Sequence, residues 1–175
     1  DNDYLTVPVH SDFDFGADDF CIDLFYRSNG APSYDRFIDI VNDDDSNSVL
    51  QFTTALDQLR VVYYSSGGSV NNEDTADILQ DNTWQHIAFT KSGTTIRVFL
   101  NGILKNTISV GLTMDSIHAT LPIYIGIEHD MLGEVDGWIE EFRVSRGTAR
   151  WTENFTPPTA PYDPVTLPNK RLAIC

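Results

Sequence analysis

The sequence predicts an all-β fold, either a sandwich or a barrel. Aromatic and β-branched residues are plentiful, segments with helical periodicity are nearly absent, and turn residues recur at short intervals. A chain of 175 residues fits one domain with a sizeable core, because a domain near this size buries roughly 70% of its unfolded surface. No repeat with a period of roughly 20 to 50 residues is present, which sets propellers and solenoids aside.

The clearest local pattern is a β-hairpin within residues 84–107. Apolar residues alternate on both sides of a connection at 91–94, and a second reversal follows at Asn101-Gly102. An Asn-Gly pair favours a type I′ turn, because both residues tolerate positive φ. The alternation places Arg97 and Phe99 opposite the core-facing residues of their strand, so both are expected on an accessible face.

Alternation and turn residues also delimit the other expected elements. Further strands are predicted at residues 4–7, 20–27, 36–41, 49–54, 59–64, 108–112, 121–127 and 138–145. Residues 42–47 and 65–72 are expected to be polar loops. The prolines within 157–161 cannot donate to a sheet ladder, so the predicted domain is 1–162 and residues 163–175 are expected to be a C-terminal strap or linker.

Charge and cysteine content narrow the functional classes. With 26 acidic and 11 basic residues the formal net charge is −15, a field that repels phosphate backbones, so nucleic acid is not an expected partner. The simpler explanation of this negative charge is a solvated acidic surface that keeps the protein soluble, although the same acidic residues would also suit divalent cations. Cys21 is expected to be a packed thiol within a strand, and a disulfide with Cys175 is not expected. No apolar run approaches the roughly 20 residues that span a bilayer, so membrane insertion is not expected.

A set of motifs in a fixed order resembles one superfamily. The motifs are Tyr4-Leu5-Thr6-Val7-Pro8, Phe13-Asp14-Phe15-Gly16, Trp84-Gln85-His86-Ile87-Ala88, Phe99-Leu100-Asn101-Gly102 and Gly137-Trp138-Ile139-Glu140-Glu141-Phe142-Arg143-Val144-Ser145. With them, nearly the whole chain resembles the concanavalin A-like, laminin-G-like lectin/glucanase superfamily. The segment 147–158 is similar to the versions found in bacteriophage tail and virion proteins. The resemblance implies a two-sheet antiparallel jelly-roll sandwich used for glycan or protein recognition.

The same resemblance implies a calcium site. In pentraxins, which resemble this fold, an Asp-Asn pair from one loop and a Glu-x-Asp from another hold calcium. Glu128 and Asp130 match the second pair, and Asn47 matches the family Asn. Ser46 stands where the family has Asp, with Asp45 one residue away. The implied Ca²⁺ ligands are therefore Asp45, Asn47, Glu128 and Asp130, and the alternative is that both loops are merely solvated turns.

Glycan contacts are expected where aromatic rings lie beside directed polar groups, because sugars stack through their apolar faces and hydrogen-bond through their hydroxyls. The expected ligand contacts are Arg97, Phe99, His129 and Trp151. Trp84 and Trp138 are expected in the core instead, because both begin strands with alternating patterns.

An enzymatic alternative rests on three carboxylates near residue 137. Glu134, Asp136 and Glu140 resemble the Glu-x-Asp-x-x-Glu motif of family-16-type β-glucanases, but the last spacing is one residue too long. Retaining hydrolysis needs two carboxyl groups about 5 to 5.5 Å apart, and fold analogy alone says little about catalysis. The expected protein is not an enzyme.

The leading hypothesis is a non-catalytic, lectin-like module that binds glycans or a receptor on a cell surface. It would belong to a larger extracellular or virion-surface protein, with calcium assistance left open. The alternative is an assembly or adhesion subunit that pairs with other chains of a larger structure. Family members usually carry one more strand before 4–7, and an unpaired edge invites a partner.

Overall fold

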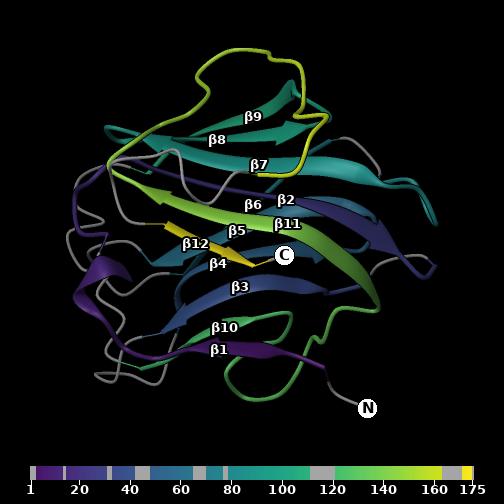
Figure 1. Ribbon diagram of the computed structural model, residues 1–175, viewed down its shortest axis with the longest axis horizontal. Coiled ribbons are helices and arrows are strands. Elements are labelled where there is room, and N and C mark those ends of the chain that lie inside the picture. The colour runs from purple at the N-terminus through teal and green to yellow at the C-terminus, as the bar shows by residue number, and fades with distance from the viewer. Residues whose placement is uncertain are drawn as a thin grey trace.

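The computed structural model describes residues 3–13, 15–30, 33–41, 48–64, 70–76, 79–110, 121–162 and 171–174. Within these residues the chain forms two six-stranded antiparallel sheets that enclose one hydrophobic core (Figure 1). The predicted all-β, two-sheet antiparallel sandwich is therefore confirmed. No helix in this part of the chain is long and apolar enough to cross a membrane.

The two sheets are named sheet A and sheet B. Sheet A has the order β1-β10-β3-β4-β5-β6, with bounds Leu5–Val7, Ile123–Ile125, Arg36–Val41, Ser48–Ala55, Gln58–Tyr64 and Val70–Asp74. Sheet B has the order β12-β11-β2-β7-β8-β9, with bounds Arg171–Ile174, Gly137–Arg146, Phe20–Ser28, Gln85–Ser92, Thr95–Leu100 and Ile103–Ser109. A short 3₁₀ helix, η1 at Ser11–Phe13, follows β1.

Most predicted strands are present with small shifts at their ends. The reversal between β8 and β9 has positive φ at both Asn101 (50°) and Gly102 (77°), as a type I′ turn requires. The loop prediction for 65–72 was wrong at its end, because β6 begins at Val70 and pairs with β5 despite its polar sequence. The strand predicted at 108–112 is the end of β9. The structure also adds β12, which pairs with β11, and the domain boundary at residue 162 stays a prediction.

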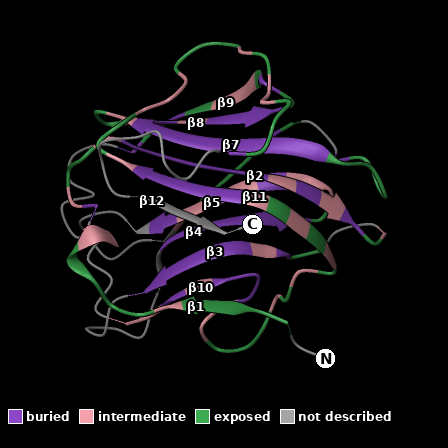
Figure 2. Ribbon diagram, in the orientation of Figure 1, coloured by how far each residue is buried: buried purple, intermediate pink, exposed green. Residues whose placement is uncertain are grey.

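The core lies between the sheets and is built mostly from alternate residues of their strands. Figure 2 shows that the central strands β3 and β7 are buried along most of their length. At its centre Phe52 of β4 stacks on Phe89 of β7, with ring centroids 4.1 Å apart and planes 8° from parallel. Aromatic pairs of this kind add to the burial of their area. Cys21 is a free, buried thiol, but it lies on the opposite face of β2 from the core residues Phe20 and Ile22.

A long segment without regular structure covers part of the outer face of sheet B. This segment, residues 147–162, is called the strap from here on and is distinct from the C-terminal segment predicted at 163–175. It arches over β7, β8 and β9 in Figure 1. It is tied to the type I′ turn, because the Phe155 backbone N–H donates to the Gly102 carbonyl oxygen (2.9 Å) and the Leu104 N–H donates to Asn154 Oδ1 (2.8 Å). The strap and the β8–β9 turn therefore lie in direct backbone contact.

This contact predicts different costs for two glycine substitutions. Gly93 and Gly102 both have positive φ, but a Cβ at Gly93 would meet nothing, whereas one at Gly102 would overlap the Phe155 carbonyl oxygen. We expect Gly93→Ala to cost about 1 kcal/mol of unfolding free energy from backbone strain. Gly102→Ala should cost about 1–3 kcal/mol more, because the strap must move. Denaturant unfolding measures both, and equal costs would contradict the tight packing of the strap.

Candidate functional site

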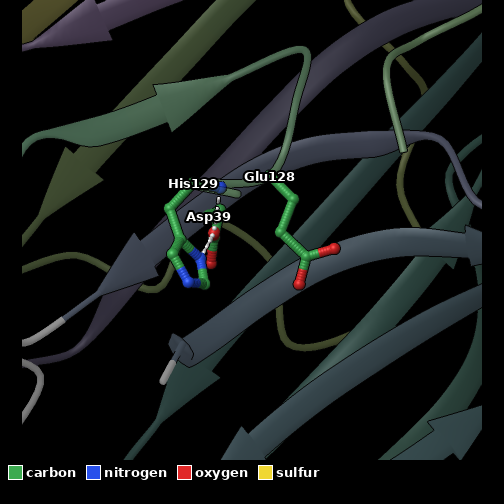
Figure 3. A group of neighbouring side chains, drawn as sticks. All are labelled: Asp39, Glu128 and His129. Carbon is green, nitrogen blue, oxygen red and sulfur yellow. Dashed lines mark hydrogen bonds and ion pairs between the residues drawn. The ribbon is translucent and has the colours of Figure 1, made fainter. Parts of the chain in front are cut away.

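The loop between β10 and β11 brings polar residues onto the outer side of sheet A. Gly126 has φ 88°, and the loop closes on itself where the Met131 N–H donates to the Glu128 carbonyl (2.9 Å). Its neighbour on the sheet is Asp39 of β3, which faces away from the core because Ile38 and Ile40 on either side of it are core residues. The resulting set, called the Asp39 group, consists of Asp39, Glu128 and His129 (Figure 3).

Asp39 and His129 form the inner part of this group. His129 Nδ1 lies 2.8 Å from Asp39 Oδ2, and the His129 backbone N–H donates to the same oxygen (2.9 Å). Asp39 is fully buried, and its Oδ1 has no hydrogen-bond partner among the described residues. Burial alone would lower the pKa of His129, but the Asp39 carboxylate outweighs it, so the pKa of His129 is raised.

Glu128 points away from this pair and is held by other residues. Its Oε2 lies 2.8 Å from Arg36 Nη2, and its Oε1 accepts a hydrogen bond from Gln51 Nε2 at 2.7 Å. Figure 3 shows the carboxylate turned aside from the Asp39–His129 contact. Both oxygens of Glu128 are therefore already satisfied by protein groups.

The described residues do not by themselves make a calcium site. Potential ligand atoms of the Asp39 group lie within 4.8 Å of one another, but Ca²⁺ takes six to eight oxygen ligands. One of the three donors is an imidazole, which suits zinc, copper or nickel better. Of the predicted ligands, Asp130 is exposed and its Oδ1 accepts from the Leu132 N–H (3.1 Å). Asp45 and Asn47 lie outside the described residues.

Sequence reasoning missed Asp39, although a signal was present. It is a carboxylate in the middle of the otherwise apolar stretch 37–41. A charge buried in an apolar strand needs a partner, and that requirement marks the position before the partner is known. The partner, His129, comes from 90 residues further along the chain.

The three carboxylates of the enzymatic alternative line one pocket of about 950 Å³. Residues 3–5, at the start of β1, also line it. Asp136 Oδ1 accepts a hydrogen bond from Asn29 Nδ2 (3.1 Å). Glu141, which also lines the pocket, accepts a hydrogen bond from the Tyr162 N–H (2.7 Å), so the pocket is acidic and two of its carboxylates are already engaged.

The predicted ligand contacts are not brought together. His129 belongs to the Asp39 group at sheet A, whereas Phe99 and Trp151 lie at the outer face of sheet B. The prediction that Phe99 is accessible was wrong, because the strap covers it. Phe99 has no exposed surface and packs against Phe155 with centroids 5.3 Å apart, and Trp151 stacks on the same ring at 3.9 Å. Arg97 is half-buried on β8.

Under the strap lies a buried ionic network centred on Asp23 of β2. Arg143 of β11 donates to both carboxylate oxygens (2.9 and 2.7 Å), and the Tyr162 hydroxyl donates to Oδ2 (2.5 Å). His86 Nε2 lies 3.4 Å from the same Oδ2. Burial would raise the pKa of Asp23, but the hydrogen bonds from His86, Arg143 and Tyr162 outweigh it and lower that pKa. The strap is thus anchored to an ionised, buried carboxylate.

A bulge in β11 makes this network geometrically feasible. Its register with β2 shifts between Glu140 and Arg143, and Glu141 has φ 51°. Before the bulge Ile139 packs against the core, whereas after it Phe142 is a core residue. The change of phase turns Arg143 to the outer face, where Asp23 is its register partner.

Beyond the strap, the outer face of sheet B carries two exposed tryptophans. Trp84 and Trp138 are 38% and 46% exposed, so the prediction that both are core residues was wrong. Between them lies Arg27, whose guanidinium carbon is 4.2 Å from the Trp138 ring centroid and 5.9 Å from that of Trp84. Alternation was read correctly as a two-faced strand, but it does not say which face is covered. We call these three residues the tryptophan platform.

Comparison with known proteins decides the family. The sequence model of the concanavalin A-like lectin/glucanases superfamily, in its laminin-G form, matches residues 1–153. The chain belongs to this family. No curated protein sequence matches it.

Solved structures of the same fold are distant in sequence. A candidate carbohydrate-binding protein from Bacteroides ovatus is 17% identical, with a TM-score of 0.63 over 87% of this chain and 42% of that one. Domain 4 of an extracellular arabinanase from Geobacillus stearothermophilus, solved with arabinotriose, is 15% identical, with a TM-score of 0.60 over 82% and 66%. A pentraxin from Limulus polyphemus is 16% identical, with a TM-score of 0.57 over 86% and 68%. The present chain thus spans less than half of the Bacteroides protein. At these levels of sequence identity, the similarities show a shared fold only.

The Asp39–His129 contact predicts a pH-dependent contribution to stability. Because the pKa of His129 is raised in the folded state, its stabilisation is fully present below the unfolded pKa near 6.5 and is lost as pH rises through the folded pKa. We expect His129→Gln to lower the unfolding free energy by about 1–2 kcal/mol at low pH and by less in alkaline buffer. His10→Gln is the matched control, because His10 also lies beside a carboxylate, Asp12 at 3.5 Å, but is 58% exposed, so the loss of this pair should cost less. A loss that is equal at both pH values would contradict the ion pair.

Proposed function

We propose that this chain is a non-catalytic carbohydrate-recognition module. It would bind glycans on a cell surface as part of a larger extracellular or viral protein. Membership of a lectin/glucanase family supports the proposal. Two proteins that share the fold also support it: the Bacteroides protein is named as carbohydrate-binding, and the arabinanase domain was solved with arabinotriose. The similarity of segment 147–158 to bacteriophage tail and virion proteins supports a location on a virion surface.

The observation that carries the proposal is the exposure of Trp84 and Trp138 on one sheet face. Large aromatic side chains normally bury most of their area. Two of them left open beside a polar group match the chemistry of sugar recognition, in which rings stack and directed donors bind hydroxyls. The described strap covers the neighbouring aromatic residues but leaves these two open.

Glycan binding by the whole chain tests the proposal. We expect the chain to retain at least one oligosaccharide on a glycan array, and to do so equally in about 1 mM CaCl₂, the range of extracellular calcium modules, and in EDTA. Calcium independence is expected because Arg36 and Gln51 already satisfy Glu128. Binding lost in EDTA would instead support a calcium site completed by Asp45 and Asn47. No retention of any sugar under either condition would sink the proposal.

A glycoside hydrolase is the second candidate, favoured by the pocket that Glu134, Asp136 and Glu140 share. Two observations argue against a pair of catalytic carboxylates at this position. The motif is one residue longer than in the β-glucanases, and Asp136 already accepts a hydrogen bond from Asn29. Release of reducing ends from laminarin or lichenan, lost in Glu134→Gln and Glu140→Gln, would establish this candidate instead.

An assembly or adhesion subunit is the remaining candidate, favoured by the edge of sheet A. Among the described strands β1 pairs only with β10, and its Tyr4 and Leu5 end is 41% and 47% exposed (Figure 2). An open edge can accept a strand from another chain. Sedimentation that shows a stable monomer at micromolar concentration would count against this role for the chain alone.

A further inference from the structure

The tryptophan platform is a single row of side chains across three neighbouring strands. Trp138 of β11 is the register partner of Arg27 of β2. Tyr26 pairs with Gln85 on β7, so the next position places Trp84 beside Arg27 on its other side, as their 5.9 Å contact shows. Because adjacent strands lie about 4.8 Å apart, the two tryptophan backbones are about 10 Å apart. The two indoles therefore offer separate stacking surfaces.

The strap sets one limit of the platform. In the next row of sheet B, Phe25 of β2 pairs with His86 of β7. His86 is buried and contacts the strap rings Trp151 and Phe155 at 5.7 and 5.6 Å. The covered part of the face thus begins one row away from the open tryptophans.

Arg27 has no acidic partner among the described residues, a property that it shares with Arg97 of β8. Within the described part of the chain it makes no hydrogen bond or ion pair, and its buried Nε has no acceptor. In contrast, four other arginines pair with carboxylates: Arg36, Arg60, Arg143 and Arg146. In a chain with 26 acidic residues, an arginine held only between two rings retains its hydrogen-bonding capacity for another molecule.

We infer that the tryptophan platform binds a neutral oligosaccharide of at least two sugar rings. The apolar face of one ring stacks on Trp138 and that of another on Trp84, while the guanidinium of Arg27 donates to hydroxyls between them. The cation–π contacts fix the guanidinium between the two indoles before a ligand arrives, so little side-chain freedom is lost on binding. This assignment rests on the proposed carbohydrate-binding function and names its site and ligand class.

Charge around the platform excludes acidic sugars. Glu140 follows Trp138 by two residues on β11, Asp136 precedes it by two, and Asp81 lies shortly before Trp84; all three are exposed. Together with the net charge of −15, they repel uronates and sulfated glycans, whose charge one arginine does not balance. The same carboxylates accept hydrogen bonds from neutral hydroxyls.

Calorimetric titration of the full chain with arabinotriose, cellotetraose and trigalacturonate tests this inference. We expect a neutral oligosaccharide to bind, its monosaccharide to bind at least about tenfold more weakly, and trigalacturonate not to bind.

Trp84→Ala, Trp138→Ala and Arg27→Gln should each weaken binding by about tenfold or more. Tyr34→Ala is the matched control and should bind as the unmodified chain does, because Tyr34 is also exposed (47%) and near an arginine, Arg36, at 6.0 Å.

The outcomes separate the platform from the broader proposal. If the unmodified chain binds a glycan and the three platform variants bind it equally well, with unchanged melting temperatures, the platform is overturned while the carbohydrate-binding function stands. Tighter binding of trigalacturonate than of neutral sugars overturns the ligand class. If no glycan from a wide array binds the unmodified chain, the function and the platform both fall.

Discussion

The buried carboxylate of Asp23 is the constraint on which the outer face of sheet B depends. It has no exposed surface and is ionised because Arg143, Tyr162 and His86 surround it. Leaving such a charge unpaired costs about 3–5 kcal/mol. The fold meets this requirement with a bulge in β11 that turns Arg143 outward and with a strap that delivers Tyr162, whose backbone N–H also donates to Glu141 (2.7 Å).

Anchoring the strap at Asp23 divides one sheet face into two parts with different roles. On the covered part, Trp151 stacks on Phe155, and Phe155 packs edge-on against Phe99, which has no exposed surface. On the open part, Trp84 and Trp138 remain exposed around Arg27. The proposed recognition site therefore lies on the outer face of a sheet, beside the strap, whereas lectin-like folds commonly carry recognition in loops.

The sequence was sufficient for the fold class and for most strands, but not for β12 or for the surface. Period-two alternation and the Asn101-Gly102 turn are local signals, and both were read correctly. Phe99 was predicted to be accessible but is buried, and Trp138 was predicted to be in the core but is exposed. Both errors arise because alternation separates the two faces of a strand without showing which face a distant segment covers. That cover comes from Phe155 and Tyr162, far along the chain. In the same way the importance of Asp39 becomes clear only when His129 is placed beside it.

The most direct test of this account uses the chain's three tryptophans, of which Trp84 and Trp138 lie on the open platform and Trp151 lies on the strap. Nitrogen-15 NMR resolves their indole N–H signals as a neutral oligosaccharide is added. The account predicts that the signals of Trp84 and Trp138 move together along one binding curve while that of Trp151 stays in place. Movement of Trp151 alone, or binding that leaves all three signals unchanged, would contradict it.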